Sequence, residues 1–179
     1  MQTRFPQRER LQIFPALAAG LPEELRSGAA VLDGEIVCLD PDGKSQFEEL
    51  LFRRGEARFQ AFDLLWYEGD DLRYSPLIER KALLRAITPQ RGAWLRYSGH
   101  VEREGEELFK LACEHDLEGI VAKHLLSPYI LDSEPRWLKI RNTDYSQWVG
   151  REELFERERS NDPDLSLWDD CTLVCANAE

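Results

Sequence analysis

Residues 29–40, AAVLDGEIVCLD, predict a β-strand. The two-residue period of a strand places Asp33 and Glu35 on one face and Leu32 on the other. Two neighbouring acids on one face indicate either a solvated edge or a carboxylate that accepts hydrogen bonds from sugar hydroxyls. In the second case, Gly34 would let a ligand approach the backbone.

Extended and helical patterns alternate along the rest of the chain without an internal repeat. Further strands are predicted at residues 57–68, 94–101, 119–125 and 136–142. Helices are predicted at residues 14–27, 45–54, 75–87 and 104–116. Several strands occur without a helix after each one, so the order favours an α+β domain with an antiparallel or mixed sheet and flanking helices.

Local signals predict where three of these helices begin or end. Pro22 is expected to break the first helix, because proline cannot donate a backbone hydrogen bond. Ser45 is expected to cap the second helix, with Glu48 completing a capping box. Ser75 is expected to cap the third helix, with Pro76 at its first position.

The composition excludes several classes of protein. The 179 residues are 42% hydrophobic, which suits one domain with a real core and argues against disorder. The sequence has no run of about 18 apolar residues, and its charged start lacks the apolar region of a signal peptide. We therefore expect a soluble cytoplasmic protein that makes no membrane contact. The four cysteines show no zinc spacing and are expected to be free thiols.

The net charge of −11 argues against a broad surface for nucleic acid. Residues 151–179 alone hold nine acidic and three basic side chains. Contact with nucleic acid would have to come from a partner or from local arginine clusters, each of which can also be a solvated face. These clusters are Arg4, Arg8 and Arg10, and Arg53, Arg54 and Arg58.

Two later strands carry charges that suggest a binding site. In WLKIRN, residues 137–142, Lys139 and Arg141 lie about 7 Å apart on one face and could clamp an anion. An ordinary exposed strand face would show the same alternation. In LEGIVAKH, residues 117–124, Glu118 lies beside apolar residues, which suggests either a metal ligand or a buried ion pair.

Five motifs, taken in order, resemble those of the adenylation domain of ATP-dependent DNA ligases, within the covalent nucleotidyltransferase superfamily. They are VLDGEIVCLD, FQAFDLLW, IERKALL, EGIVAKH and WLKIRN. The similarity is closest to bacterial ligases linked to end joining and spans residues 28–150. It implies an α+β nucleotidyltransferase fold of the ATP-grasp-like ligase adenylation type. That fold has antiparallel or mixed sheets, flanking helices and a nucleotide cleft.

The resemblance also implies roles for particular residues. Glu35 would hydrogen-bond the ribose of ATP or AMP, and Phe62 would stack on the adenine, although Phe62 could simply pack in the core. Glu118 would hold the catalytic Mg²⁺ or Mn²⁺. Three cations would bind the phosphates and act in the catalytic step: Lys139, Arg141 and Lys123. Asp63 and Arg80 are expected to support the structure.

The family reaction has three steps: a lysine attacks ATP, the AMP passes to a 5′-phosphorylated nick, and the 3′-hydroxyl displaces it. The nucleophile belongs to a KxDG motif upstream of VLDGEIV, whereas the first lysine here is Lys44. Self-adenylation is therefore expected to be incomplete. The residues after 150 are too few for an OB-fold domain and lack its basic motif. Arg141 replaces a lysine that many relatives carry, so the phosphate geometry is expected to differ.

The expected organisation is a remnant N-terminal segment at 1–27, a partial adenylation domain at 28–150, and an acidic C-terminal helix and tail at 151–179. Three hypotheses stay open. In the first, the chain is a truncated or split ligase core acting on nicked or broken DNA, with another domain or protein supplying the lysine segment. In the second, it is a non-catalytic module that binds nucleotide or adenylated DNA. In the third, it is an interaction-only remnant whose tail docks a partner through Trp168.

Overall fold

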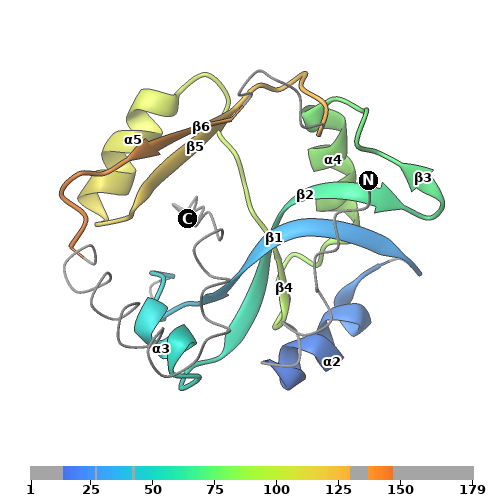
Figure 1. Ribbon diagram of the computed structural model, residues 1–179, viewed down its shortest axis with the longest axis horizontal. Coiled ribbons are helices and arrows are strands. Elements are labelled where there is room, and N and C mark those ends of the chain that lie inside the picture. Colours follow the sequence, from blue (N-terminus) through green and yellow to red (C-terminus); the bar gives the residue numbers. More distant parts are fainter. Residues whose placement is uncertain (1–13, 27, 42, 130–136, 147–179) are drawn as a thin grey trace, which may run out of the picture. The chain divides into compact units, whose positions relative to one another are not determined.

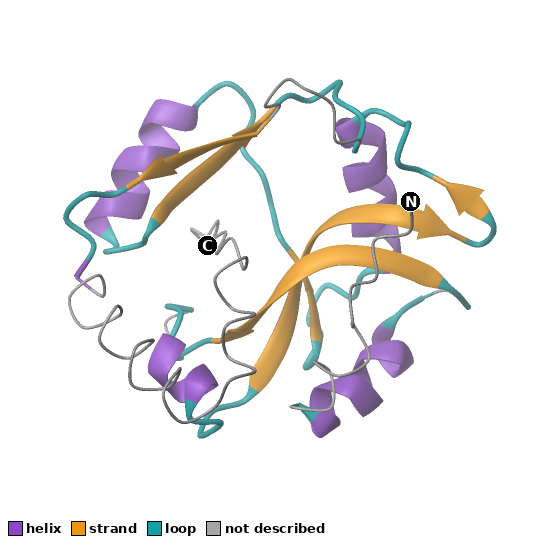
Figure 2. Cartoon of the chain, viewed as in Figure 1, coloured by secondary structure: helices purple, strands orange, loops and turns teal. Residues whose placement is uncertain are grey.

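The computed structural model describes residues 14–26, 28–41, 43–129 and 137–146. These residues form helices and two separate sheets (Figure 2). None of the helices in this part of the chain is long and apolar enough to cross a membrane. The predicted acidic helix and tail, Trp168 and the first arginine cluster lie outside the described residues.

The chain divides into two compact units. Among the described residues, unit 1 contains 14–99 and 123–129, and unit 2 contains 100–122 and 137–146. The chain therefore passes from one unit to the other three times. The division into segments 1–27, 28–150 and 151–179 stays a prediction.

Unit 1 is built on a mixed four-stranded sheet (Figure 1). Two long strands, β1 (Ala30–Cys38) and β2 (Ala57–Tyr67), pair antiparallel. The short strand β3 (Asp70–Asp71) also pairs antiparallel with β2, whereas β4 (Leu95–Tyr97) pairs parallel with it. The predicted mixed sheet is confirmed.

Three helices pack on this sheet: α2 (Pro15–Glu24), α3 (Phe47–Leu51) and α4 (Leu77–Ile87). Each fully buried leucine contributes roughly 1.5–3 kcal/mol to stability. One apolar cluster joins α4 to β2 and β4, and a second joins α2 and α3 to β1 and β2. The first comprises Ala61, Leu64, Leu84, Ile87 and Leu95, and the second comprises Leu17, Cys38, Leu50 and Ala57.

Unit 2 contains α5 (Gly105–Glu114) and a two-stranded sheet of β5 (Gly119–Lys123) and β6 (Trp137–Arg141), where Lys123 itself belongs to unit 1. Gly119 allows these strands to approach. Its φ is +142°, and a Cβ atom there would lie 2.1 Å from the carbonyl oxygen of Ile140. The glycine that follows Glu118 is therefore required by strand packing.

The predicted break at Pro22 is wrong, because α2 continues through this residue to Glu24. Pro22 lies in the last turn, where only one donor is lost. The Glu24 carboxylate then fixes the helix end by accepting backbone N–H bonds from Ala93, Trp94 and Leu95 at 2.6, 3.0 and 2.7 Å. Contacts with a distant segment thus outweigh the local effect of proline.

The predicted serine caps are also wrong. Helix α3 begins at Phe47, and Gln46, rather than Ser45, is its N-cap residue. Helix α4 begins at Leu77, one residue later than predicted, and its N-cap residue Pro76 makes no side-chain cap hydrogen bond.

Main-chain carbonyls from a distant segment satisfy the start of α4 instead. The N–H groups of Leu77 and Ile78 donate to the carbonyl oxygens of Ser127 and Leu125, each at 3.0 Å. The first donors of a helix need partners from outside the helix, and here tertiary structure supplies them. The segment that follows Lys123 is thereby fixed to unit 1.

Candidate nucleotide-binding site

Phe62 lies at a β-bulge in β2. Asp33 of β1 pairs with Asp63, and the next residue, Gly34, pairs with Ala61, so the register passes over Phe62. An extra residue in one strand bends it and changes the direction of the side chain. The bulge therefore gives the half-buried Phe62 ring an orientation that strict alternation would not provide.

Lys123 covers one face of this ring. Its Nζ lies 5.0 Å from the centroid of the Phe62 ring, which is the distance of a cation–π contact. Burial lowers the pKa of Lys123, although the nearby charges of Asp63 and Asp33 partly oppose this effect. The structure thus brings together two of the predicted site residues.

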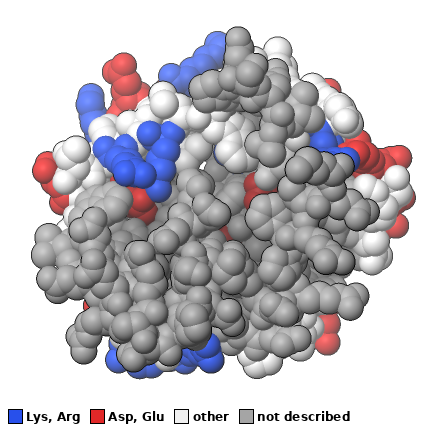
Figure 3. Space-filling view, viewed as in Figure 1, with Lys and Arg blue, Asp and Glu red and all other residues white. Residues whose placement is uncertain are grey.

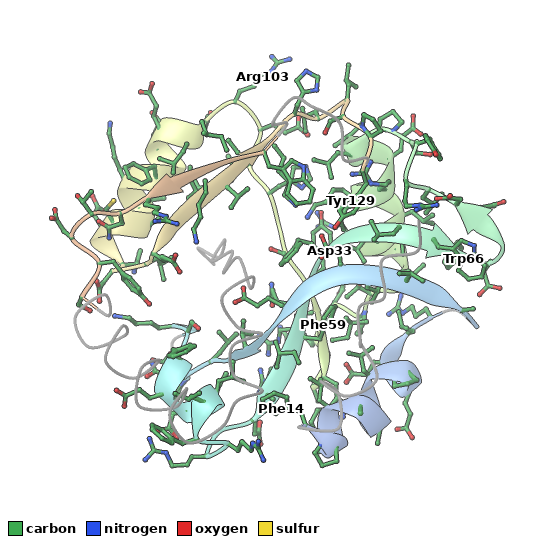
Figure 4. The ribbon with its side chains drawn as sticks, in the orientation of Figure 1. Phe14, Asp33, Phe59, Trp66, Arg103 and Tyr129 are labelled. Atoms are coloured by element: carbon green, nitrogen blue, oxygen red, sulfur yellow. The ribbon has the colours of Figure 1, made fainter. Side chains whose placement is uncertain are left out.

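Asp33 is held by Tyr129, a residue that the sequence analysis missed. The Tyr129 hydroxyl donates to Asp33 Oδ2 at 3.0 Å, and both side chains are labelled in Figure 4. Burial raises the pKa of Asp33, whereas the Tyr129 hydrogen bond and the charge of Lys123 act in the opposite direction. Burial also raises the pKa of Tyr129, and the Asp33 charge adds to this effect.

Glu35 lies on β1 opposite Gln60 and is half-buried. The structure gives a packing reason for the neighbouring Gly34. A Cβ atom at Gly34 would lie 2.5 Å from the carbonyl oxygen of Gln60 and 2.6 Å from the ring of Phe59. Figure 4 labels Phe59 on β2. The close approach of the paired strand therefore requires glycine at this position by itself, and the approach of a ligand to this backbone stays a prediction.

Lys81 is another buried cation of unit 1. The sequence analysis did not predict its position. Its Nζ donates to the carbonyl oxygen of Ser98 at 2.5 Å and lies 4.4 Å from the centroid of the Tyr97 ring. Burial lowers the pKa of Lys81 to about 8, and the charge of Lys123 contributes in the same direction. Lysine in an amphipathic helix usually reaches water, so the sequence offered no signal for this position.

Glu118 and Lys139 form an ion pair in unit 2. Lys139 Nζ donates to Glu118 Oε1 at 2.6 Å, and Glu118 is only 4% exposed. The sequence left open a metal ligand or a buried ion pair at Glu118, and the structure shows the ion pair. Arg141 is exposed at the end of β6, the strand that carries Lys139.

Asn142 fixes the backbone next to this pair. Its N–H donates to the carbonyl oxygen of Glu118 at 2.8 Å, and its side-chain amide donates to that of Leu117 at 3.0 Å. These bonds hold the two peptide groups that flank the Cα atom of Glu118. The sequence analysis did not predict this role of Asn142.

Within the part of the chain that the structure describes, Glu118 has no set of further acidic, histidine or cysteine side chains with which to hold a divalent metal. Among the described residues, no group of three or more His, Cys, Asp and Glu side chains is arranged to hold a metal ion. Mg²⁺ is commonly bound by one or two carboxylates and by the phosphates of a substrate. A single carboxylate beside a lysine fits a metal that arrives with the phosphates of a nucleotide.

Basic and acidic side chains both lie on the surface of unit 2. Figure 3 shows Lys and Arg side chains at the upper left of the view, where α5, β5 and β6 lie in Figure 1. In unit 1, Arg54 pairs with Glu49 at 3.0 Å and Arg58 with Glu56 at 3.3 Å. These pairs favour the solvated-face interpretation for the predicted cluster at Arg53, Arg54 and Arg58.

The fold is that of a nucleotidyltransferase-type domain. A family model described as "ATP dependent DNA ligase domain" matches residues 6–141. The chain belongs to this family, and the resemblance inferred from the five motifs is confirmed.

Named relatives support the same assignment. The chain is 36% identical over 116 residues to the multifunctional non-homologous end joining protein LigD of Pseudomonas aeruginosa, covering 62% of this chain and 14% of that protein. It is 32% identical over 124 residues to the SPbeta prophage-derived DNA ligase-like protein LigB of Bacillus subtilis, covering 65% and 46%.

A solved structure is similar over most of the chain. It is the mycobacterial DNA ligase D complexed with ATP and MES, with a TM-score of 0.62 and 30% sequence identity. The match covers 73% of this chain and 44% of that one. The chain therefore spans less than half the length of each of these three proteins.

Proposed function

We propose that the chain binds ATP and takes part in the ATP-dependent joining of nicked or broken DNA through an adenylate intermediate. The observation that carries this proposal is the 30% identity, with a TM-score of 0.62, to a ligase D solved with ATP. Membership of the ligase family and the pairing of predicted site residues within each unit support it.

In this proposal, unit 1 binds the nucleoside. Glu35 accepts hydrogen bonds from the ribose hydroxyls, and Phe62 stacks on the adenine. Because Lys123 covers one face of the Phe62 ring, the base uses the opposite face. The Lys123 charge also adds to the positive potential that the phosphates meet.

Unit 2 acts on the phosphates. Lys139 and Arg141 donate hydrogen bonds to phosphate oxygens and stabilise the negative charge that develops on them during adenylate transfer. Arg141 stays protonated throughout, so it acts through its charge and not as a base. Glu118 holds the divalent cation, Mg²⁺ or Mn²⁺, which when bound neutralises phosphate charge.

ATP binding is tested by calorimetry with Mg²⁺, together with the intact mass of the chain. We expect saturable binding that weakens by about five- to one-hundred-fold in Phe62→Ala, the usual range for loss of an aromatic stack on a base. Phe52→Ala removes a 45%-exposed aromatic side chain of the same unit and is the matched control. Absence of saturable binding by the unaltered chain would overturn the proposal.

The intact mass separates binding from self-adenylation. No KxDG sequence occurs among the 179 residues, so we expect no gain of AMP from ATP. A gain of one AMP would reveal a nucleophile elsewhere in these residues, and peptide mapping would locate it.

Strand joining is tested with a nick that already carries AMP, because this last step does not use the lysine nucleophile. With Mg²⁺ at high protein concentration, we expect sealing that Glu118→Ala abolishes and Glu35→Ala weakens. ATP binding without sealing would favour the hypothesis of a non-catalytic binding module and would contradict the joining role of these residues.

A further inference from the structure

Glu118 and Lys139, to which we assign metal binding and phosphate binding, contact each other. The contact of 2.6 Å joins Glu118 Oε1, a metal-ligating oxygen, to the ammonium group that would bind a phosphate. The side chain of Glu118 is 5% exposed and that of Lys139 is 21% exposed. A cation at Glu118 Oε1 would therefore lie beside the Lys139 ammonium and be repelled by it.

The ion pair compensates the charge of a carboxylate that has little access to water. A carboxylate with so little exposure is strongly destabilised when its compensating cation is removed. Lysine keeps its charge but has a flexible four-carbon stem, so it can change partners. Asn142 fixes the main chain at Glu118, and the moving group is therefore Lys139.

We infer that nucleotide and metal enter unit 2 by an exchange of partners. Lys139 leaves Glu118 for a nucleotide phosphate and is replaced at Glu118 by the divalent cation. This inference rests on the proposed function and adds that the nucleotide and the metal together replace the contact between Lys139 and Glu118. The carboxylate keeps a cation and the ammonium keeps an anion throughout, so no buried charge is left without compensation.

The exchange makes the two ligands depend on each other. Metal alone would displace Lys139 without offering it an anion, and ATP alone would draw Lys139 away from a carboxylate that needs a cation. Each ligand alone therefore binds weakly, and each strengthens the other reciprocally. The described residues supply no three-ligand metal group that could pull the metal in without the nucleotide.

The first test measures Mn²⁺ binding without nucleotide, by electron paramagnetic resonance at pH 8. In Lys139→Met, the ammonium no longer competes for Glu118, so we expect Mn²⁺ to bind about tenfold more tightly or better. The same variant should bind ATP more weakly. Lys110→Met removes one positive charge from an exposed position on α5 and should change Mn²⁺ affinity by less than about twofold. A folded Lys139→Met protein with unchanged or weaker Mn²⁺ binding would overturn the inference.

The second test remains decisive if Lys139→Met does not fold. Glu118→Gln keeps the size of the side chain but releases Lys139 from a carboxylate. In the presence of EDTA, we expect this variant to bind ATP at least about threefold more tightly than the unaltered chain, and added Mg²⁺ should give no further gain. Weaker metal-free ATP binding by Glu118→Gln would contradict the exchange.

These outcomes separate the inference from the proposed function. If the unaltered chain does not bind ATP even with Mg²⁺, the proposed function fails, while the Mn²⁺ measurements still test the competition at Glu118. If ATP binds but Lys139→Met and Glu118→Gln behave in the opposite way, the nucleotide site stands and the exchange is wrong.

Discussion

Arg80 holds Asp63 with two hydrogen bonds in the interior of unit 1. Its Nε donates to Oδ1 and its Nη2 to Oδ2, each at 2.8 Å, and both side chains are fully buried. Nη1 of the same guanidinium donates to the carbonyl oxygen of Ser127 at 3.1 Å. The pair therefore joins β2, α4 and the segment after Lys123, in keeping with the structural role expected from the sequence.

Removing one partner of this pair should destabilise the protein strongly. We expect Asp63→Asn to lower the free energy of unfolding by roughly 3–5 kcal/mol, because the arginine charge stays buried. Urea unfolding measures the change. Asp71→Asn is the matched control, since Asp71 also accepts two bonds from an arginine, Arg73, at 2.9 and 2.7 Å, but in an exposed position. An equal loss in both variants would contradict this account.

Gly119→Ala should disrupt unit 2. The substitution puts a side chain at φ +142° and places its Cβ 2.1 Å from the carbonyl oxygen of Ile140, so β5 and β6 must move apart. We expect a loss of at least about 1–3 kcal/mol in urea unfolding from the backbone strain alone. Gly105→Ala, where a Cβ meets nothing within 4 Å, should be neutral or stabilising by up to about 1 kcal/mol. Equal effects at both glycines would refute the packing argument.

Lys81 should make stability rise with pH above neutrality. Its pKa is about 8 in the folded protein and about 10.4 in an unfolded chain, so between these values the unfolded state holds the additional proton. The free energy of unfolding then increases as the pH rises, by up to about 3 kcal/mol in total. Lys123 acts in the same direction.

Urea unfolding at pH 7.5, 8.5 and 9.5 checks this prediction, and Lys81→Met should reduce the slope. Measurements stop below pH 10 because tyrosines with a raised pKa, Tyr97 and Tyr129, begin to oppose the effect there. A flat profile for the unaltered chain would show that Lys81 is not desolvated.

Tyr129→Phe should cost about 1 kcal/mol of stability through loss of the hydrogen bond to Asp33. The pKa of Asp33 should also rise, because this hydrogen bond lowers it in the unaltered protein. Urea unfolding and carboxyl-carbon NMR titration measure the two effects. Tyr74→Phe, at a side chain that is 72% exposed, should change neither quantity. An unchanged Asp33 pKa in Tyr129→Phe would mean that the hydroxyl does not bond to Asp33 in solution.

Strands were easier to predict than helix ends. Alternation of apolar and polar residues is a property of the strand itself, so the predicted strands around Asp33 and Lys139 are confirmed. The start of α4 depends on carbonyl groups from residues 125 and 127, which no local pattern at Ser75 could reveal. The bulge at Phe62 depends on a single skipped residue in the pairing of β1 with β2.

The sequence selected candidate site residues but could not predict their contacts. Glu118 and Lys139 could be selected because acids beside apolar residues and cations on one strand face are visible in the sequence. Their contact across 21 residues, and that of Asp33 with Tyr129 across 96, arise only from folding. The roles of Glu35, Phe62, Lys123 and Arg141 in binding nucleotide stay predictions.

The carbonyl groups that complete α4 also set an order for folding during synthesis on the ribosome. Arg80 of helix α4 emerges early. The carbonyl oxygen of Ser127, to which Arg80 donates a hydrogen bond, emerges 47 residues later. By then, residues 100–122 of unit 2 have already been made. Until Ser127 has been made, water is the partner of the donors at the start of α4 and of the Arg80 guanidinium, so unit 1 cannot complete its interior before that point.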